Sequence, residues 1–157
     1  MVLTFKNEIP CIEDQSCIEL VRSIQTPFYV YSQKSISDTY TQLKKNLKKD
    51  IFFAVKANSN QAIITLLDSL GAGMDVVSLE EMQRVLKAGV KPNKIIFEGV
   101  GKSKLDIVSA IQNNIKQINI ESIEELHMVN SIANSLNKKT NIGLRLNPDI
   151  DSQTINK

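Results

Sequence analysis

The chain has 157 residues, which is enough for one ordinary domain with a sizeable core. Its hydrophobic content of 42% and charged content of 23% are typical of a globular protein, and its net charge of +2 gives no reason to expect binding to nucleic acid or to a membrane. Two cysteines and one histidine are too few for a typical zinc site, and no apolar run approaches membrane-spanning length. We therefore expect a cytoplasmic protein with no metal centre.

Strand and helix patterns alternate through most of the chain. Residues 27–31 are a first strand candidate, and residues 34–47 form the first expected helix. Five strand-like runs then start about 21 to 24 residues apart. These runs are 51–55, 73–77, 94–97, 117–120 and 141–146, and helices are expected between them at 61–70, 78–88, 103–112 and 122–136. Ser78 with Glu81, and Ser122 with Glu125, have the spacing of helix-capping pairs.

Strict alternation with short links predicts a parallel sheet with helical crossovers. An open doubly wound sheet and a (β/α)8 barrel both fit this pattern. The even repeat, and the absence of a phosphate-binding glycine turn after the first strand, favour the α/β TIM barrel. Such a barrel needs eight units and ~250 residues, so about five units indicate a truncated barrel. We expect the chain alone to be poorly soluble or partly folded, because it would leave an open sheet edge.

The main candidate for chemistry is Lys56, which ends the apolar run at residues 51–55. Such a run is typical of a strand buried on both faces, and α/β proteins assemble their active sites where strands end in loops. Burial at this point favours the neutral amine, which can condense with a carbonyl group. The alternative is a lysine that only extends from a strand end into water.

Two nucleotide-binding motifs fail on their spacing. Gly101-Lys102-Ser103 would end a P-loop only if position 96 were glycine, but it is isoleucine. The glycines at positions 71 and 73 precede a predicted strand, whereas the dinucleotide fingerprint needs them after one. His127 falls in the middle of a predicted helix and is interpreted as an ordinary helix residue.

Residues 53–58, FAVKAN, resemble the pyridoxal-phosphate lysine motif of the fold-type III decarboxylases, a family of barrel enzymes. Further stretches agree with this family in order and spacing: TPFYVY at 26–31, GAGMDVVS at 71–78, IFEGVGKS at 96–103 and INIESIEEL at 118–126. LRLNPDID at 144–151 is similar to the diaminopimelate decarboxylase branch. The sequence departs from the family at Glu80, where glycine is usual, and at Ile155, which replaces a histidine.

The resemblance implies pyridoxal 5'-phosphate as the cofactor, with Lys56 as its covalent anchor and the catalytic residue. It places Asp75 beside Lys56, and it assigns Glu81 and Arg145 to a polar network beneath the cofactor. Lys56, Asp75 and Arg145 are thus the expected cofactor-binding residues. The alternative for both Glu81 and Arg145 is a structural ion pair that closes the barrel interior, and for Glu81 a helix cap as well. The family's phosphate loop and substrate-binding residues lie beyond Lys157.

By this resemblance, residues 33–157 are the first part of the pyridoxal-binding barrel, and residues 1–32 carry a strand that joins a C-terminal β-domain. The implied parent is a homodimer with shared active sites that converts meso-2,6-diaminopimelate to L-lysine and CO2, and the chain alone is expected to be inactive. Three alternatives stay open. They are another decarboxylase of the family, acting on carboxynorspermidine, ornithine or arginine; a non-catalytic carrier of the cofactor; and a structural or regulatory remnant.

Overall fold

The computed structural model describes residues 3–148 and residue 150. Its centre is a five-stranded sheet in which each strand pairs in parallel with the next along the chain. The strands are β4 (Phe52–Ala54), β5 (Gly73–Val76), β6 (Ile95–Phe97), β7 (Gln117–Ile120) and β8 (Ile142–Leu144). The connections contain α3 (Gln61–Ser69), α4 (Leu79–Lys87), α5 (Lys104–Gln112) and α6 (Ile123–Ser135), with short 3-10 helices η1 (Val55–Ala57) and η2 (Pro92–Lys94). These elements confirm the expected alternation, with ends that differ by at most two residues.

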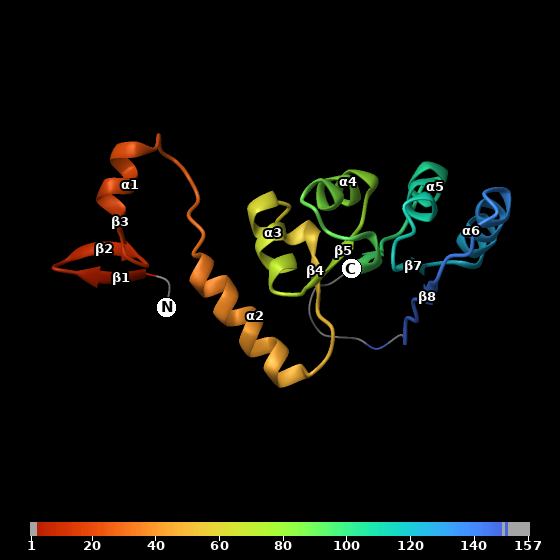
Figure 1. Ribbon diagram of the computed structural model, residues 1–157, viewed down its shortest axis with the longest axis horizontal. Helices are drawn as coiled ribbons and strands as arrows, with labels where there is room; N and C mark the ends of the chain where they lie inside the picture. The colour runs from red at the N-terminus through yellow and green to blue at the C-terminus, as the bar shows by residue number, and fades with distance from the viewer. Residues whose placement is uncertain (1–2, 149, 151–157) are drawn as a thin grey trace.

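The four connecting helices cover one face of this sheet (Figure 1). Side chains alternate between the two faces of a strand, so every second residue points toward the helices. Those that do so are almost completely buried: Met74, Val76, Ile95, Phe97, Ile118 and Ile120. The opposite face carries the half-buried residues Asp75, Ile96, Gln117 and Asn119, and we call it the open face.

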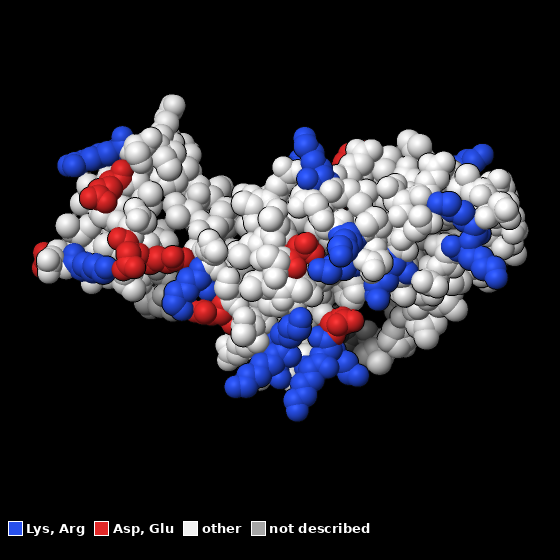
Figure 2. All heavy atoms as spheres, viewed as in Figure 1, with Lys and Arg blue, Asp and Glu red and all other residues white. Residues whose placement is uncertain are grey.

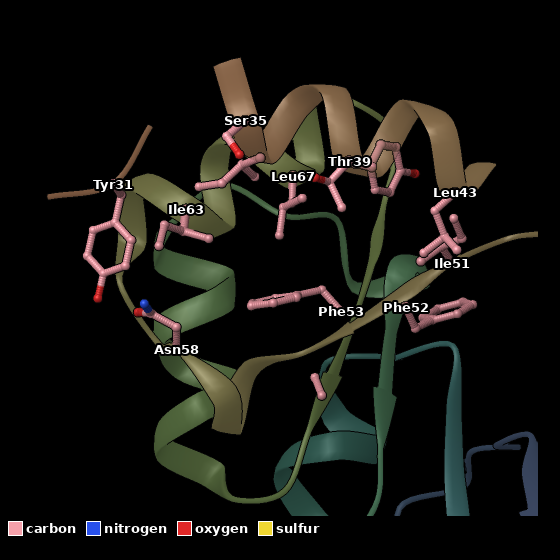
Figure 3. A pocket seen from close by; sticks show the side chains of 13 residues that line it. Tyr31, Ser35, Thr39, Leu43, Ile51, Phe52, Phe53, Asn58, Ile63 and Leu67 are labelled. Carbon is pink, nitrogen blue, oxygen red and sulfur yellow. The ribbon is translucent and has the colours of Figure 1, made fainter. Parts of the chain in front are cut away.

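β4 departs from the prediction of a strand buried on both faces, because all three of its residues are only half-buried. In the described sheet β4 is an edge strand, with β5 as its paired neighbour. Its outer side forms an apolar groove of about 510 Å³ together with α2 (Gln33–Leu47) and α3. Figure 3 shows Phe53 pointing into this groove, below Ile63 and Leu67 of α3.

The N-terminal segment forms a small antiparallel sheet that the sequence pattern does not predict. β1 (Leu3–Lys6), β2 (Ile9–Ile12) and β3 (Gln15–Ser16) pair in chain order and lead into α1 (Cys17–Ser23). Asn7 and Glu8 make the turn between β1 and β2, and both have positive φ (51° and 64°), the geometry that a two-residue hairpin needs. This sheet lies apart from the five-stranded sheet, beyond α2 (Figure 1).

Residues 27–31, where a strand is expected, have irregular backbone in the structure, and Tyr29 is 90% exposed. A strand requires a neighbouring backbone as hydrogen-bond partner, and within the described residues no strand pairs with this stretch. The partner implied by the family resemblance belongs to a C-terminal β-domain, so this strand stays a prediction. α2 begins soon after it, capped by Ser32, whose Oγ accepts a hydrogen bond from Ser35 N at 2.9 Å.

α2 ends in a basic cluster made of Lys44, Lys45, Lys48 and Lys49, which are all exposed. Figure 2 shows basic side chains gathered over this end of the helix. Lys48 is the C-cap residue and has a left-handed backbone conformation, with φ of 52°. Positive charge near a helix C-terminus interacts favourably with the helix dipole, so this cluster is a solvated helix end.

A buried ion pair joins the carboxyl ends of β6 and β7 to α6. Lys102 Nζ donates to Gly99 O at 2.8 Å, to Asn119 O at 2.6 Å and to Glu125 Oε1 at 2.8 Å. The side chains of Lys102 and Glu125 are only 1% and 8% exposed. Glu125 Oε2 accepts in turn from Glu121 N at 2.8 Å. All three ammonium hydrogens of Lys102 therefore have partners, and we call this arrangement the Lys102 clamp.

We predict that Lys102→Met lowers the free energy of unfolding by about 3–5 kcal/mol, because it leaves the Glu125 carboxylate buried without its counter-charge. Lys94→Met is the matched control. Lys94 binds Asp68 at 2.7 Å, but these side chains are 37% and 26% exposed, so we expect a loss of about 1 kcal/mol or less. Urea unfolding of the full-length protein and of the two variants measures both changes. Equal losses in the two variants would contradict the prediction.

We also predict that the 157-residue chain, produced by itself, self-associates or is only partly folded. The groove at β4 offers apolar surface, and the edges of β4 and β8 that are free in the described sheet offer unpaired strand backbone. Light scattering after size exclusion, combined with a thermal melt, measures both properties. A monodisperse monomer with a sharp, cooperative melt is the opposite outcome.

Candidate active site

Lys56 lies in η1, the turn that follows β4 at the carboxyl end of the sheet. Val55 before it is fully buried, and Asn58 N donates to Val55 O at 3.0 Å, which closes the turn. The Asn58 side chain accepts from Asn60 N at 3.1 Å, and Asn60 caps α3 by accepting from Ala62 N at 2.9 Å. Strand, turn and helix thus fix the backbone on both sides of Lys56.

The Lys56 residue is exposed, although it lies at the strand end where the sequence places it. The desolvation expected from a strand buried on both faces is wrong for the described part of the chain, because β4 is an edge strand. An exposed primary amine is accessible to a carbonyl compound from solvent.

Asp75 is on the open face next to Lys56. It pairs with Ala54 in the β4–β5 register, two residues before Lys56 along the chain. Burial is the largest cause that raises the pKa of Asp75, to about 6; the charges of Glu98 and Glu81 act in the same direction, and the Lys56 ammonium opposes them. Asp75 Oδ1 is buried and has no hydrogen-bond partner among the described residues. Asp75 and Lys56 thus interact electrostatically, while a cofactor role for either stays a prediction.

Three more polar side chains continue the open face across β6 and β7. Asn119 Nδ2 donates to Glu98 Oε1 at 2.6 Å, and Gln117 Nε2 donates to Asn119 Oδ1 at 2.7 Å. Gly143 on β8 pairs with Asn119, and a side chain at Gly143 would collide with both amides. We call Glu98, Asn119 and Gln117 the polar chain.

Arg145 and Glu81, expected to share a network beneath the cofactor, have separate partners. Arg145 Nη1 donates to Glu121 Oε1 at 3.2 Å, and the Arg145 side chain is 61% exposed. Glu81 Oε2 accepts from Val77 N at 2.9 Å, while Glu81 N donates to Ser78 Oγ at 3.2 Å. The capping interpretation of Glu81 is confirmed. A cofactor contact for Arg145 stays a prediction.

The polar chain and the Lys102 clamp were not predicted from the sequence. A signal existed for the two amides, because β7 alternates polar and apolar residues (QINI), which is typical of a strand with one polar face. No comparable signal marks Glu98 or Lys102. Apart from Gly99, which is three residues from Lys102, their partners come from 17 to 23 residues away in the chain, so only the folded sheet brings these groups together.

The residues at this edge of the sheet fit an aldehyde cofactor. An exposed amine is available as the nucleophile, and the neighbouring carboxyl group has a buried oxygen without a partner in the described residues. Among all the residues that the structure describes, no group of three or more His, Cys, Asp or Glu side chains could hold a metal ion. None of the described helices is long and apolar enough to cross a membrane.

A family described as pyridoxal-dependent decarboxylase, pyridoxal binding domain, matches residues 33–157. Diaminopimelate decarboxylase from Helicobacter pylori strain J99 is 47% identical over 139 residues, which cover 87% of the chain and 34% of that protein. The protein of the same name from Zymomonas mobilis is 40% identical over 157 residues, covering 96% of the chain and 37% of that protein. The chain therefore spans about a third of the length of these relatives.

Solved structures of diaminopimelate decarboxylases share the fold. The structure from M. jannaschii in complex with L-lysine has a TM-score of 0.91 at 34% identity, covering 98% of the chain and 37% of that protein. The structure from Helicobacter pylori with L-lysine has a TM-score of 0.84 at 44% identity, covering 87% of the chain and 36% of that protein. The predicted fold, a truncated TIM barrel, is thereby confirmed, and the described residues contain five of its strands and the four helices between them. The chain belongs to the pyridoxal-dependent decarboxylases, within their pyridoxal binding domain.

Proposed function

We propose that the chain carries the cofactor-anchoring residues of a diaminopimelate decarboxylase, which converts meso-2,6-diaminopimelate to L-lysine and CO2. Relatives of this name are 40% and 47% identical over most of the chain, and two structures of such enzymes contain L-lysine. The observation that carries the proposal is the exposed amine of Lys56 at the carboxyl end of a barrel strand, beside the half-buried carboxyl group of Asp75.

Pyridoxal 5'-phosphate, when bound, acts as an electron sink for the carbanion that the loss of CO2 leaves. Lys56 would hold the cofactor covalently through Nζ, and the same amine would be placed to move protons at the reacting carbon. Asp75 lies near that amine, and the charge of its ionised form attracts the Lys56 ammonium. The Lys102 clamp keeps the neighbouring strand ends in place, so the open face keeps its shape.

The rest of the site is proposed to come from beyond the chain. Because the chain spans about a third of its relatives' length, we assign the remaining barrel strands, the phosphate contacts and the substrate contacts to the rest of the protein. The groove at β4 suits the strand that closes the barrel, since closure requires a parallel partner on that side. Arg145 is proposed to contact the cofactor in the complete barrel.

Residues 1–32 are proposed to join a β-rich domain. β1, β2 and β3 form an antiparallel sheet of their own, and several apolar side chains of this segment are exposed: Leu3, Phe5, Ile9, Ile18, Val21 and Ile24. Exposed apolar surface of this kind marks contact with another domain or subunit, which also supports a homodimer with shared active sites. Both cysteines are unpaired, and this fits the proposed cytoplasmic location.

Two alternatives use the same anchor. A decarboxylase acting on ornithine, arginine or carboxynorspermidine has less support, because the lysine and arginine decarboxylase structures are each 24% identical to the chain and share the fold alone. A non-catalytic carrier of the cofactor needs no β-rich domain, so the exposed apolar side chains of the N-terminal segment weigh against it.

We predict that borohydride traps pyridoxal phosphate on Lys56 of the full-length protein, and that Lys56→Ala loses both the trapped label and turnover, because no other described side chain takes its place at this strand end. Lys87→Ala, a change at another exposed lysine, keeps both. Peptide mapping locates the label, and CO2 release from meso-diaminopimelate, ornithine and arginine measures turnover. Label or turnover retained in Lys56→Ala overturns the proposal.

We predict that Asp75→Asn removes a pH dependence of stability between about pH 4 and pH 6. The pKa of Asp75 is raised from 3.8 to about 6, so in this range the folded protein binds more protons than the unfolded chain, and stability falls as the pH rises. Because the carboxyl group is partly exposed, solvent screening reduces the expected change in the free energy of unfolding across this range to about 1 kcal/mol. Urea unfolding of both proteins across this range measures it. The same slope in wild type and Asp75→Asn would show that Asp75 is not its source.

A further inference from the structure

Glu13 links the N-terminal sheet to the barrel part of the chain. Glu13 and Asp14 form the turn between β2 and β3, and Glu13 has a left-handed backbone conformation, with φ of 55°, which is uncommon for glutamate. Glu13 Oε1 accepts from Ser32 Oγ at 2.5 Å and from Lys34 N at 3.0 Å. Two hydrogen bonds thus connect the tip of this hairpin to the start of α2, and we call this arrangement the Glu13 joint.

The Glu13 joint completes the N-terminal cap of α2. The first backbone N–H groups of a helix have no partner inside the helix, and negative charge at this end interacts favourably with the helix dipole. Ser32 Oγ satisfies Ser35 N at 2.9 Å, and Glu13 satisfies Lys34 N. Ser32 is only 7% exposed, so its hydroxyl group is held between the two parts of the chain. The N-terminal sheet and α2 therefore fix each other through this cap.

The surroundings of the joint are open. A polar cleft of about 450 Å³ lies beside it, lined by Thr4 and Glu13 of the N-terminal segment and by Asp38 and Gln42 of α2 among others. Parts of a chain that meet without a large apolar interface are expected to move relative to each other unless specific contacts hold them. We therefore assign the orientation of the N-terminal sheet on α2 to the hydrogen bonds of Glu13.

The joint lies toward the same edge of the barrel as Lys56. α2 leads directly into β4, and Lys56 follows β4 in η1. Tyr31, next to Ser32 in the chain, and Asn58, which closes the Lys56 turn, line the same groove. Figure 3 shows both side chains at the same end of this groove. The start of α2, which Glu13 holds, is therefore close to the turn that carries the anchor.

We propose that Glu13 is a positioning residue: through the Glu13 joint it places the N-terminal sheet, and the β-rich domain that this sheet joins, at the barrel edge where Lys56 lies, and so lowers the KM for the substrate. The proposal deepens the function proposed above and rests on it, because that function assigns the substrate contacts to the rest of the protein, which includes this domain. Loosening the joint lets the domain move relative to the barrel. Substrate is then bound less well, while the anchor at Lys56 is unchanged.

Steady-state kinetics of the full-length holoenzyme test the effect on the substrate. We expect Glu13→Ala to raise the KM for meso-diaminopimelate about fivefold and to keep kcat within about twofold of wild type, because it removes hydrogen bonds that act on substrate binding alone. Glu13→Gln keeps an oxygen for Ser32 and Lys34 and restores KM to within about twofold of wild type. Asp14→Ala is the matched control. This neighbouring carboxylate binds Lys6 of its own sheet at 2.9 Å, so its loss leaves KM unchanged.

Limited proteolysis of the full-length apoprotein tests the joint without cofactor or substrate. Chymotrypsin cleaves after aromatic residues, and Tyr29 and Tyr31 are exposed in the stretch that leads into α2. We expect cleavage at these two residues to be about fivefold faster in Glu13→Ala than in wild type, because cleavage follows the population of the opened state. Asp14→Ala is cleaved at the wild-type rate.

An unchanged KM or an unchanged cleavage rate in Glu13→Ala overturns the proposal. An equal rise in KM in Asp14→Ala also overturns it, since the effect would then come from charge in general. Loss of the borohydride-trapped label on Lys56 in Glu13→Ala does the same, because Glu13 would then support the fold as a whole. In these cases wild type keeps label and turnover, so the proposed function stands. Wild-type protein without label on Lys56 or without CO2 release from meso-diaminopimelate overturns that function, and this proposal with it.

Discussion

The parallel pairing of the five strands brings their carboxyl ends to one edge of the sheet, and the site depends on this constraint. The same pairing sorts the side chains by face. Apolar residues such as Met74 and Ile118 are buried under the helices, while Asp75 and Asn119 remain on the open face. A shift of one residue in register would exchange the two sets, burying carboxyl and amide groups against apolar helices. The burial of the core therefore also holds the polar residues of the site in place.

Two lysines near this edge show how environment separates structural from chemical roles. Lys102 is almost completely buried, and its ammonium group has three acceptors, so its electron pair is not available to a carbonyl compound. Removing a charge from water is costly, and the hydrogen bonds with Gly99, Asn119 and Glu125 offset that cost. Lys56 is exposed, and its electrostatic partner is the half-buried Asp75. The first lysine stabilises the edge, and the second is accessible to a reactant.

The chain belongs to a pyridoxal-dependent family and spans about a third of its relatives' length. Two parts of its surface expose apolar groups. β4 is half-buried beside an apolar groove, and the N-terminal sheet exposes apolar residues such as Phe5. Both surfaces have the character of contacts with further parts of a protein. The surroundings of Lys56, by contrast, are built entirely from local structure: a strand, a 3-10 turn and a capped helix.

The sequence by itself determined the order and type of the barrel elements, because apolar periodicity and capping residues such as Ser78 and Ser122 act within a few neighbouring residues. It also determined that Lys56 lies at the carboxyl end of the first barrel strand, in the turn that follows β4. The N-terminal strands have only two to four residues, too few to show a period, and they escaped prediction. Only the tertiary structure decided that Glu98 meets Asn119, that Lys102 meets Glu125, and that Arg145 pairs with Glu121. These partners lie on different elements, so their contacts depend on strand register and packing, which no local sequence pattern encodes.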